Sequence, residues 1–176
     1  MLIGKRLKLC AIEESHLGTL AQWRSDPAVY DFFHEYAPIS VPAQREWFDA
    51  HRRDPSEINF ASVLHDGTLI GTISLVDLDF RNRNAELGRV LIGVTEQRGR
   101  GYGHEMATLA IEYAFDHLNL HKLVCEVLAT NEPACGLYHR LGFVDEGVLR
   151  QQVYKRGDYW DVQILALFRE NYSREA

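Results

Sequence analysis

The stretch LGRVLIGVTEQRGRGYGHEMATLAIEYAF, residues 87–115, decides how this chain folds. It opens with an apolar run typical of a buried strand and continues into RGRGYG at residues 98–103, which holds three glycines in five residues. The following apolar residues recur with the spacing of one helix face: Met106, Leu109, Ala110, Tyr113 and Ala114. The stretch therefore predicts a strand, a glycine-rich turn and a helix in immediate succession.

This order of elements favours an anion site at the turn. Glycine lacks Cβ, so backbone N–H groups can approach a ligand closely, and the helix start adds unpaired N–H groups and a positive dipole end. Arg98 and Arg100 can supply charge-assisted contacts to phosphate. The loop lacks the GKS/T ending of a Walker loop, and His104 stands where the dinucleotide fingerprint needs its third glycine. A plain flexible turn is the alternative.

The remaining sequence predicts a mixed α/β fold. We expect strands at 6–12, 58–65, 68–79, 85–94, 122–128, 143–154 and 160–168. We expect helices at 14–24, at 42–53, after the glycine turn, and from an N-cap at Asn131 to Gly142. Asp26-Pro27 is taken to end the first helix, with a loop to about Ile39, and Asp66-Gly67 predicts a hairpin turn.

The length and the composition of the chain limit the classes of protein to which it can belong. The 176 residues fit one domain, 1–176, and 46% are apolar, with no run long enough to span a membrane. The net charge of −6 argues against a nucleic-acid surface. The odd number of cysteines, without CxxC spacing, and the lack of a signal-peptide pattern predict reduced thiols in the cytoplasm. The sequence leaves open whether the protein forms a homodimer.

Two motifs together resemble the GCN5-related N-acetyltransferases (GNAT). RGRGYG matches that family's R-x-x-G-x-G/A loop, and NEPACGLYHRLGFVDEG at 131–147 is similar to its second hallmark, N-x-x-A-x-x-x-Y-x-K/R-x-G-F. The second match is carried by Asn131, Ala134, Tyr138, Arg140, Gly142 and Phe143. WRSDPAV, nearer the N-terminus, is similar to the ribosomal-protein, polyamine and aminosugar branches. The resemblance implies a curved, mostly antiparallel sheet of about seven strands with helices on both faces, and a V-shaped split between its fourth and fifth strands.

The resemblance also implies acetyl-CoA as co-substrate. The loop would hold the pyrophosphate, and the strand before it would pair with the pantetheine arm as an added strand does. The residues it assigns to the cofactor are Leu91, Ile92, Val94, Arg98, Gly99, Arg100, Gly101, Tyr102, Gly103, Asn131, Tyr138 and Arg140. No metal is expected, since HExxH is absent and the His117/His121 pair lacks a carboxylate partner.

Two residues are candidates for proton transfer. The family pattern places Tyr138 to protonate the departing sulfur, although its helical spacing with Ala134 and Leu141 also fits a core tyrosine. Glu86 is the candidate base for the amine; alternation predicts that it shares one strand face with Gly88, Val90 and Ile92. An exposed edge glutamate is the alternative.

The acceptor amine stays open among three classes. A polyamine suits the acidic net charge, a protein N-terminus needs an open groove, and a nucleotide-linked aminosugar needs stacking and positive charge. Candidate groups for the last are Trp23, Arg24, Trp47 and Arg81. Asp31, His34 and Glu35 lie in the loop expected to cover the acceptor, and residues 154–160 form a hairpin expected to overhang it. A non-catalytic acyl-CoA sensor is the alternative from another function class.

Overall fold

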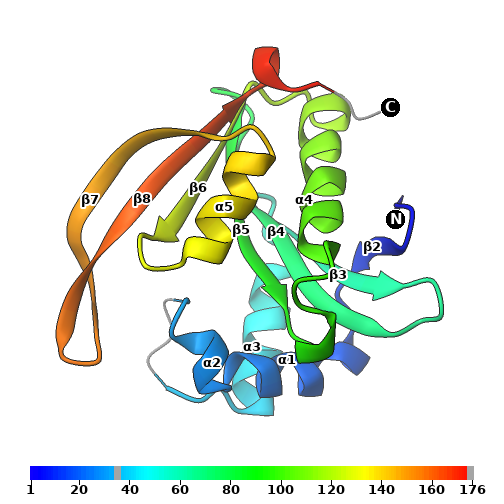
Figure 1. Ribbon diagram of the computed structural model, residues 1–176. Coiled ribbons are helices and arrows are strands. Elements are labelled where there is room, and N and C mark those ends of the chain that lie inside the picture. Colours follow the sequence, from blue (N-terminus) through cyan, green and yellow to red (C-terminus); the bar gives the residue numbers. More distant parts are fainter. Residues whose placement is uncertain (34–36, 174–176) are drawn as a thin grey trace.

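A computed structural model describes residues 1–33 and 37–173 of the chain (Figure 1). In this described part, eight strands form one sheet in the order β1-β2-β3-β4-β5-β6-β8-β7. They are β1 (Leu2–Ile3), β2 (Leu7–Ala11), β3 (Ile58–Leu64), β4 (Leu69–Asp79), β5 (Asn84–Ile92), β6 (Lys122–Leu128), β7 (Val144–Lys155) and β8 (Asp158–Phe168). Seven match the predicted strands, and the eighth, β1, has only two residues, too few for periodicity to reveal.

The sheet splits between β5 and β6, the only parallel pair among the described strands. Their pairing covers just three positions, from Asn84 opposite Lys122 to Glu86 opposite Val124. Beyond Glu86, β5 runs on to Ile92 without a partner on that side. The fourth and fifth of the seven predicted strands therefore diverge as expected, and the opening begins at Glu86.

Helices cover both faces of the sheet. They are α1 (Leu17–Arg24), α2 (Pro27–Tyr30), α3 (Val41–His51), α4 (Tyr102–Glu112) and α5 (Glu132–Arg140). Single 3₁₀ turns lie at Glu14–His16, Thr95–Gln97 and Arg169–Asn171, and a π turn, Tyr113–His117, extends α4. Figure 1 shows α4 and α5 on one side of the strands, with α1 and α2 gathered at the end where the split opens.

The short helix α2 corrects the predicted loop at 27–39. Asp26 accepts a hydrogen bond from the Ala28 amide at 2.9 Å, and Pro27 occupies the first helical position. An aspartate followed by proline ends one helix and can also cap the start of the next, and both happen here. Asn131 does cap α5 as predicted, and Gly142 follows that helix at φ +91°.

The hairpins form where the sequence supplies residues that tolerate positive φ. Gly67 adopts φ +94° between β3 and β4. Arg156 and Gly157, both at positive φ, make the two-residue turn between β7 and β8. The main core lies between the sheet and α4 and includes Leu75, Leu87 and Phe115. No helix in the described residues is both long and apolar enough to cross a membrane.

Candidate active site

The glycine-rich loop leads directly into α4, as the sequence predicts. Gly99 and Gly101 adopt φ +71° and +82°, and Gly101 is the residue immediately before the helix. The Gly101 carbonyl accepts the amide of Glu105 at 3.1 Å. Within the described residues, three amides of the first helical turn have no hydrogen-bond partner: those of Tyr102, Gly103 and His104. The loop therefore presents main-chain donors at the positive end of a helix, which is suited to a phosphate group.

The two loop arginines behave differently from each other. Arg98 turns back toward β5, and its Nε donates to the Ile92 carbonyl at 2.9 Å. Its Nη2 is buried and has no partner among the described residues. The backbone carbonyl of Arg100 accepts a hydrogen bond from Arg6 Nη1 at 2.8 Å. In this structure Arg98 thus fixes the end of β5 next to the loop.

A β-bulge in β5 corrects the predicted alternation of its side chains. Gly88 pairs with Ser74 and Leu91 pairs with Thr72, so three steps along β5 match two along β4. Arg89 takes up the extra residue at φ +54°. Glu86 shares a face with Gly88, but Val90 and Ile92 pack with Leu87 against the core. The prediction that all four even-numbered residues share one face is therefore wrong.

Ionic contacts hold the bulge in place. Arg89 donates to both carboxylate oxygens of Glu57, at 2.6 and 2.8 Å, and to Asn59 Oδ1 at 3.0 Å. Asn59 Oδ1 also accepts from the Ser74 hydroxyl at 2.6 Å. These bonds tie β3, β4 and β5 together at the face on which Glu86 lies.

Glu86 lies where β5 and β6 part, among other carboxylates. Burial is the main cause that raises its pKa to about 7, and Glu126 and Asp77 add to the rise, while Arg89 opposes it. A methyl group placed on Gly88 would lie 2.7 Å from Glu86 Oε1, so the carboxylate lies over that glycine. Glu86 therefore has the pKa of a base that works near neutral pH.

Tyr138 lies on α5, on the sheet face that α4 and α5 cover, with 5% of its surface exposed. Burial raises the pKa of its hydroxyl well above the usual value, and the neighbouring Cys125 thiol and Glu86 carboxylate add to this. The ring packs edge-on against Phe143, 5.3 Å between centroids. Tyr138 thus keeps its proton at neutral pH, as a proton donor must, and it also contributes to the core.

The remaining predicted cofactor residues lie on α5 and at the end of β5. Asn131 Oδ1 accepts the Ala134 amide at 3.3 Å and so caps α5. Arg140 is exposed on that helix. A methyl group placed on Gly103 would approach Leu137 to 3.7 Å, which puts α5 beside the start of α4. Leu91 is buried, and Ile92 and Val94 pack at the edge of the core. The glycine loop, β5 and α5 thus converge.

The tip of the β7–β8 hairpin is fastened to the segment after α2. Lys155 Nζ donates to the carbonyls of Tyr30, at 2.6 Å, Asp31, at 3.1 Å, and Phe33. Arg156 forms an ion pair with the Asp31 carboxylate. Asp31 therefore binds the hairpin in this structure, and His34 and Glu35 lie outside the described residues.

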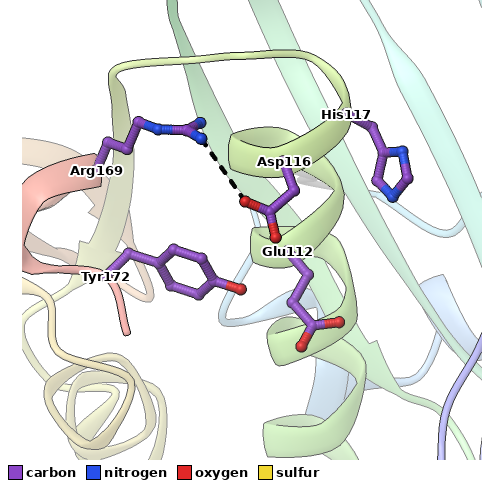
Figure 2. A pocket seen from close by; sticks show the side chains of 5 residues that line it. All are labelled: Glu112, Asp116, His117, Arg169 and Tyr172. Atoms are coloured by element: carbon purple, nitrogen blue, oxygen red, sulfur yellow. Dashed lines mark ion pairs between the residues drawn. The ribbon is translucent and has the colours of Figure 1, made fainter. Parts of the chain in front are cut away.

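Among the cavities lined by described residues, two lie on different parts of the molecule. Figure 2 shows the larger, about 570 Å³, at the far end of α4, where Arg169 and Asp116 approach to 3.7 Å beside Glu112, His117 and Tyr172. The smaller, about 20 Å³, lies between α1, α3 and the β4–β5 face. Phe33 and Gln44 line it, and the Gln44 carboxamide, 1% exposed, makes no hydrogen bond to any described residue. This volume fits one water molecule.

Several residues that organise the site carry no local sequence signal. Arg6 meets the loop from 94 positions away, and Lys155 reaches Tyr30 across 125. The Cys135 thiol, three residues before Tyr138 on α5, lies 3.5 Å from Gln163 Oε1. His117 stacks on Tyr113, and the described residues hold no group of three metal-ligating side chains.

Comparison with known proteins places this geometry in context. Residues 6–144 match the model of the acetyltransferase (GNAT) domain. A spermidine N(1)-acetyltransferase of Vibrio cholerae is 27% identical over 170 residues, 97% of each chain. That of Escherichia coli strain K12 is 31% identical over 169 residues, covering 96% of this chain and 89% of its own. A crystal structure of the Vibrio cholerae spermidine N-acetyltransferase with CoA and spermine gives a TM-score of 0.88 at 28% identity, covering 94% and 96% of the two chains.

Proposed function

The chain belongs to the GNAT acetyltransferase family and is an N-acetyltransferase that uses acetyl-CoA, and we propose that it acetylates a primary amine of a polyamine such as spermidine. The match confirms the family and the fold expected from the two sequence motifs. The identity of the acceptor and the roles of individual residues are the parts proposed below.

The cluster of carboxylates at the split carries the proposal of a polyamine. Glu86 pairs across to Val124, so Glu126, two residues further on, shares its face. Asp77 follows Val76, which pairs with Glu86 on the other side. Glu126 and Asp77 both raise the pKa of Glu86, which supports the proximity of the three carboxylates. A multiply charged ammonium compound relieves their repulsion, whereas a neutral or anionic acceptor leaves it in place.

In the proposed reaction, the cofactor and the acceptor amine approach the split from different faces of the sheet. The glycine loop holds the diphosphate of acetyl-CoA, and the free edge of β5 pairs with the pantetheine arm. The acceptor amine forms a C–N bond to the thioester carbonyl carbon, and the C–S bond breaks. Glu86 takes the first proton that the ammonium loses. Tyr138 gives its proton to the departing thiolate, and the second proton, lost by the nitrogen as the amide forms, restores the Tyr138 hydroxyl. A primary amine of pKa near 10.4 costs ~4.6 kcal/mol to deprotonate at pH 7, which is why a base matters here.

An amine panel tests the acceptor. We expect thiol release from acetyl-CoA to be fastest with spermidine, slower with short peptides and slowest with an aminosugar nucleotide. The double variant Asp77→Asn/Glu126→Gln should raise the KM for spermidine about tenfold, about 1.4 kcal/mol, because two attractive charges are lost. Glu170, an exposed carboxylate in the 3₁₀ turn after β8, supplies the matched control: Glu170→Gln should leave KM unchanged.

Other results would point elsewhere. A peptide or aminosugar preferred over spermidine would replace the polyamine as acceptor. Tight CoA binding without thiol release from any amine would favour the sensor alternative. Equal KM for spermidine in the double variant and the wild type would remove the carboxylate cluster from the explanation.

A further inference from the structure

A negative charge lies beside the proposed diphosphate site. Glu105 is in the first turn of α4, directly after the three unpaired amides, and its side chain is 14% exposed. A carboxylate at the positive end of a helix stabilises that helix, but it also repels an anion bound at the same end. A loop that grips a diphosphate therefore needs this charge neutralised from a direction that leaves the amides open.

Arg6 neutralises Glu105 from the strand side. Its backbone amide donates to Glu105 Oε1 at 2.7 Å, and its Nε donates to Oε2, also at 2.7 Å. Burial acts to raise the pKa of Glu105, but the bonds from Arg6 outweigh it and hold that pKa below its usual value. Gly4 leaves room for this pairing, since a methyl group there would lie 2.7 Å from Glu105 Oε1.

The same guanidinium also fixes the glycine loop. Arg6 Nη1 donates to the Arg100 carbonyl at 2.8 Å, and the guanidinium carbon lies 4.5 Å from the centre of the Tyr102 ring. A methyl group on Gly101 would come within 3.3 Å of Arg6 Nη2. One planar group therefore contacts residues on both sides of the bend, and it draws the Arg100 carbonyl toward β2.

We propose that Arg6 is a positioning residue for the diphosphate of acetyl-CoA, which it serves by pairing with Glu105 and by fixing the Arg100 carbonyl. The inference rests on the proposed placement of the diphosphate at this loop and does not depend on which amine is the acceptor. A lysine could supply the charge but not the fork that reaches Glu105 and Arg100 together.

The test compares a cofactor that has the diphosphate with one that lacks it. We expect Arg6→Met to weaken CoA binding, measured by calorimetry, about tenfold, and to raise the KM for acetyl-CoA similarly. Turnover of acetyl-pantetheine, which has the thioester but no diphosphate, should stay near the wild-type value. Arg45→Met is the matched control, because Arg45 forms an exposed ion pair with Glu14 at 2.9 Å; its CoA affinity should not change.

A second substitution separates charge from folding. Glu105→Gln added to Arg6→Met removes the uncompensated carboxylate and should restore part of the CoA affinity, while Arg6→Lys should fall between Arg6→Met and the wild type. Equal loss of acetyl-CoA and acetyl-pantetheine turnover, or wild-type CoA affinity in Arg6→Met, would overturn the proposal. If Gly101→Val abolishes CoA binding while Arg6→Met does not weaken it, the diphosphate placement stands and the role of Arg6 fails.

Discussion

The two sides of the split differ in how they are built. On the proposed cofactor side, the groups offered to a ligand are main-chain amides of the glycine loop and the free edge of β5. On the proposed acceptor side they are side chains: the carboxylates of Asp77, Glu86 and Glu126. If the proposed placement holds, backbone geometry, which many sequences can satisfy, binds the co-substrate, whereas a few charges that substitution changes easily select the acceptor.

The largest effect should come from the side chain that joins the two sides, Tyr138. Tyr138→Phe removes the proposed proton donor to the thiolate but keeps the ring that packs on Phe143. We expect kcat to fall about 10³-fold, within the usual range for a lost general acid, with CoA affinity unchanged. A thiol-release assay measures kcat, and calorimetry measures the affinity for CoA. Parallel loss of both would assign Tyr138 to packing alone.

Next comes the acceptor-side base. Glu86→Gln should lower kcat/KM for spermidine about 10²-fold at pH 7 and lower it less for an amine of lower pKa. In the wild type, kcat/KM should rise with pH through about 7 as Glu86 ionises. The variant should lose that step. An unchanged pH profile in Glu86→Gln would exclude the carboxylate as the base.

The same group links pH to stability. The pKa of Glu86 is raised from 4.5 to about 7 in the folded chain, so the folded state binds this proton more tightly than the unfolded state does. Its contribution to stability therefore falls as pH rises from about 4.5 to 7. Glu86→Gln should melt at a higher temperature than the wild type at pH 8 and show no such gain at pH 4.

A substitution at Gly101 tests the proposed cofactor side, where backbone amides are the ligand-binding groups. This residue adopts φ +82° with Arg6 Nη2 close by. Gly101→Val forces a β-branched residue into the left-handed region, which costs about 1–2 kcal/mol, and brings its Cβ within 3.3 Å of Arg6 Nη2, so the bend that presents the amides must shift. We expect CoA affinity to fall about 30-fold by calorimetry. Gly18→Val provides the contrast, since a Cβ at Gly18 meets nothing within 4 Å.

The order of elements and the loop could be predicted because their causes are local. Glycines at 99 and 101 supply the positive φ that the bend needs, and the apolar spacing after them forms α4. The bulge at Arg89 could not be predicted. Its cause is the pairing with Glu57, 32 residues away, and alternation alone assumes an unbroken strand.

The candidate site divides in the same way. The sequence pattern identified Tyr138 and Glu86 as candidates, and the raised pKa of Glu86 depends on Glu126 and Asp77, which only the sheet brings near. The Nε of Arg98 donates to the Ile92 carbonyl, a contact that the loop motif does not indicate, and a contact of Arg98 with phosphate stays a prediction. Arg6 contacts Arg100 across 94 positions and Lys155 contacts Tyr30 across 125, so no local motif could identify these contacts.

The smallest effect should come from the hairpin that closes the acceptor side. Lys155→Met leaves the carbonyls of Tyr30, Asp31 and Phe33 without this ammonium donor, and Phe33 lines the small cavity against the β4–β5 face. We expect the KM for the acceptor to rise about fivefold, about 1 kcal/mol, with kcat and CoA affinity unchanged. Arg150→Met, exposed on the same hairpin, is the control. Because only the acceptor side should respond, a rise in the KM for acetyl-CoA would show that the two sides of the split are not independent.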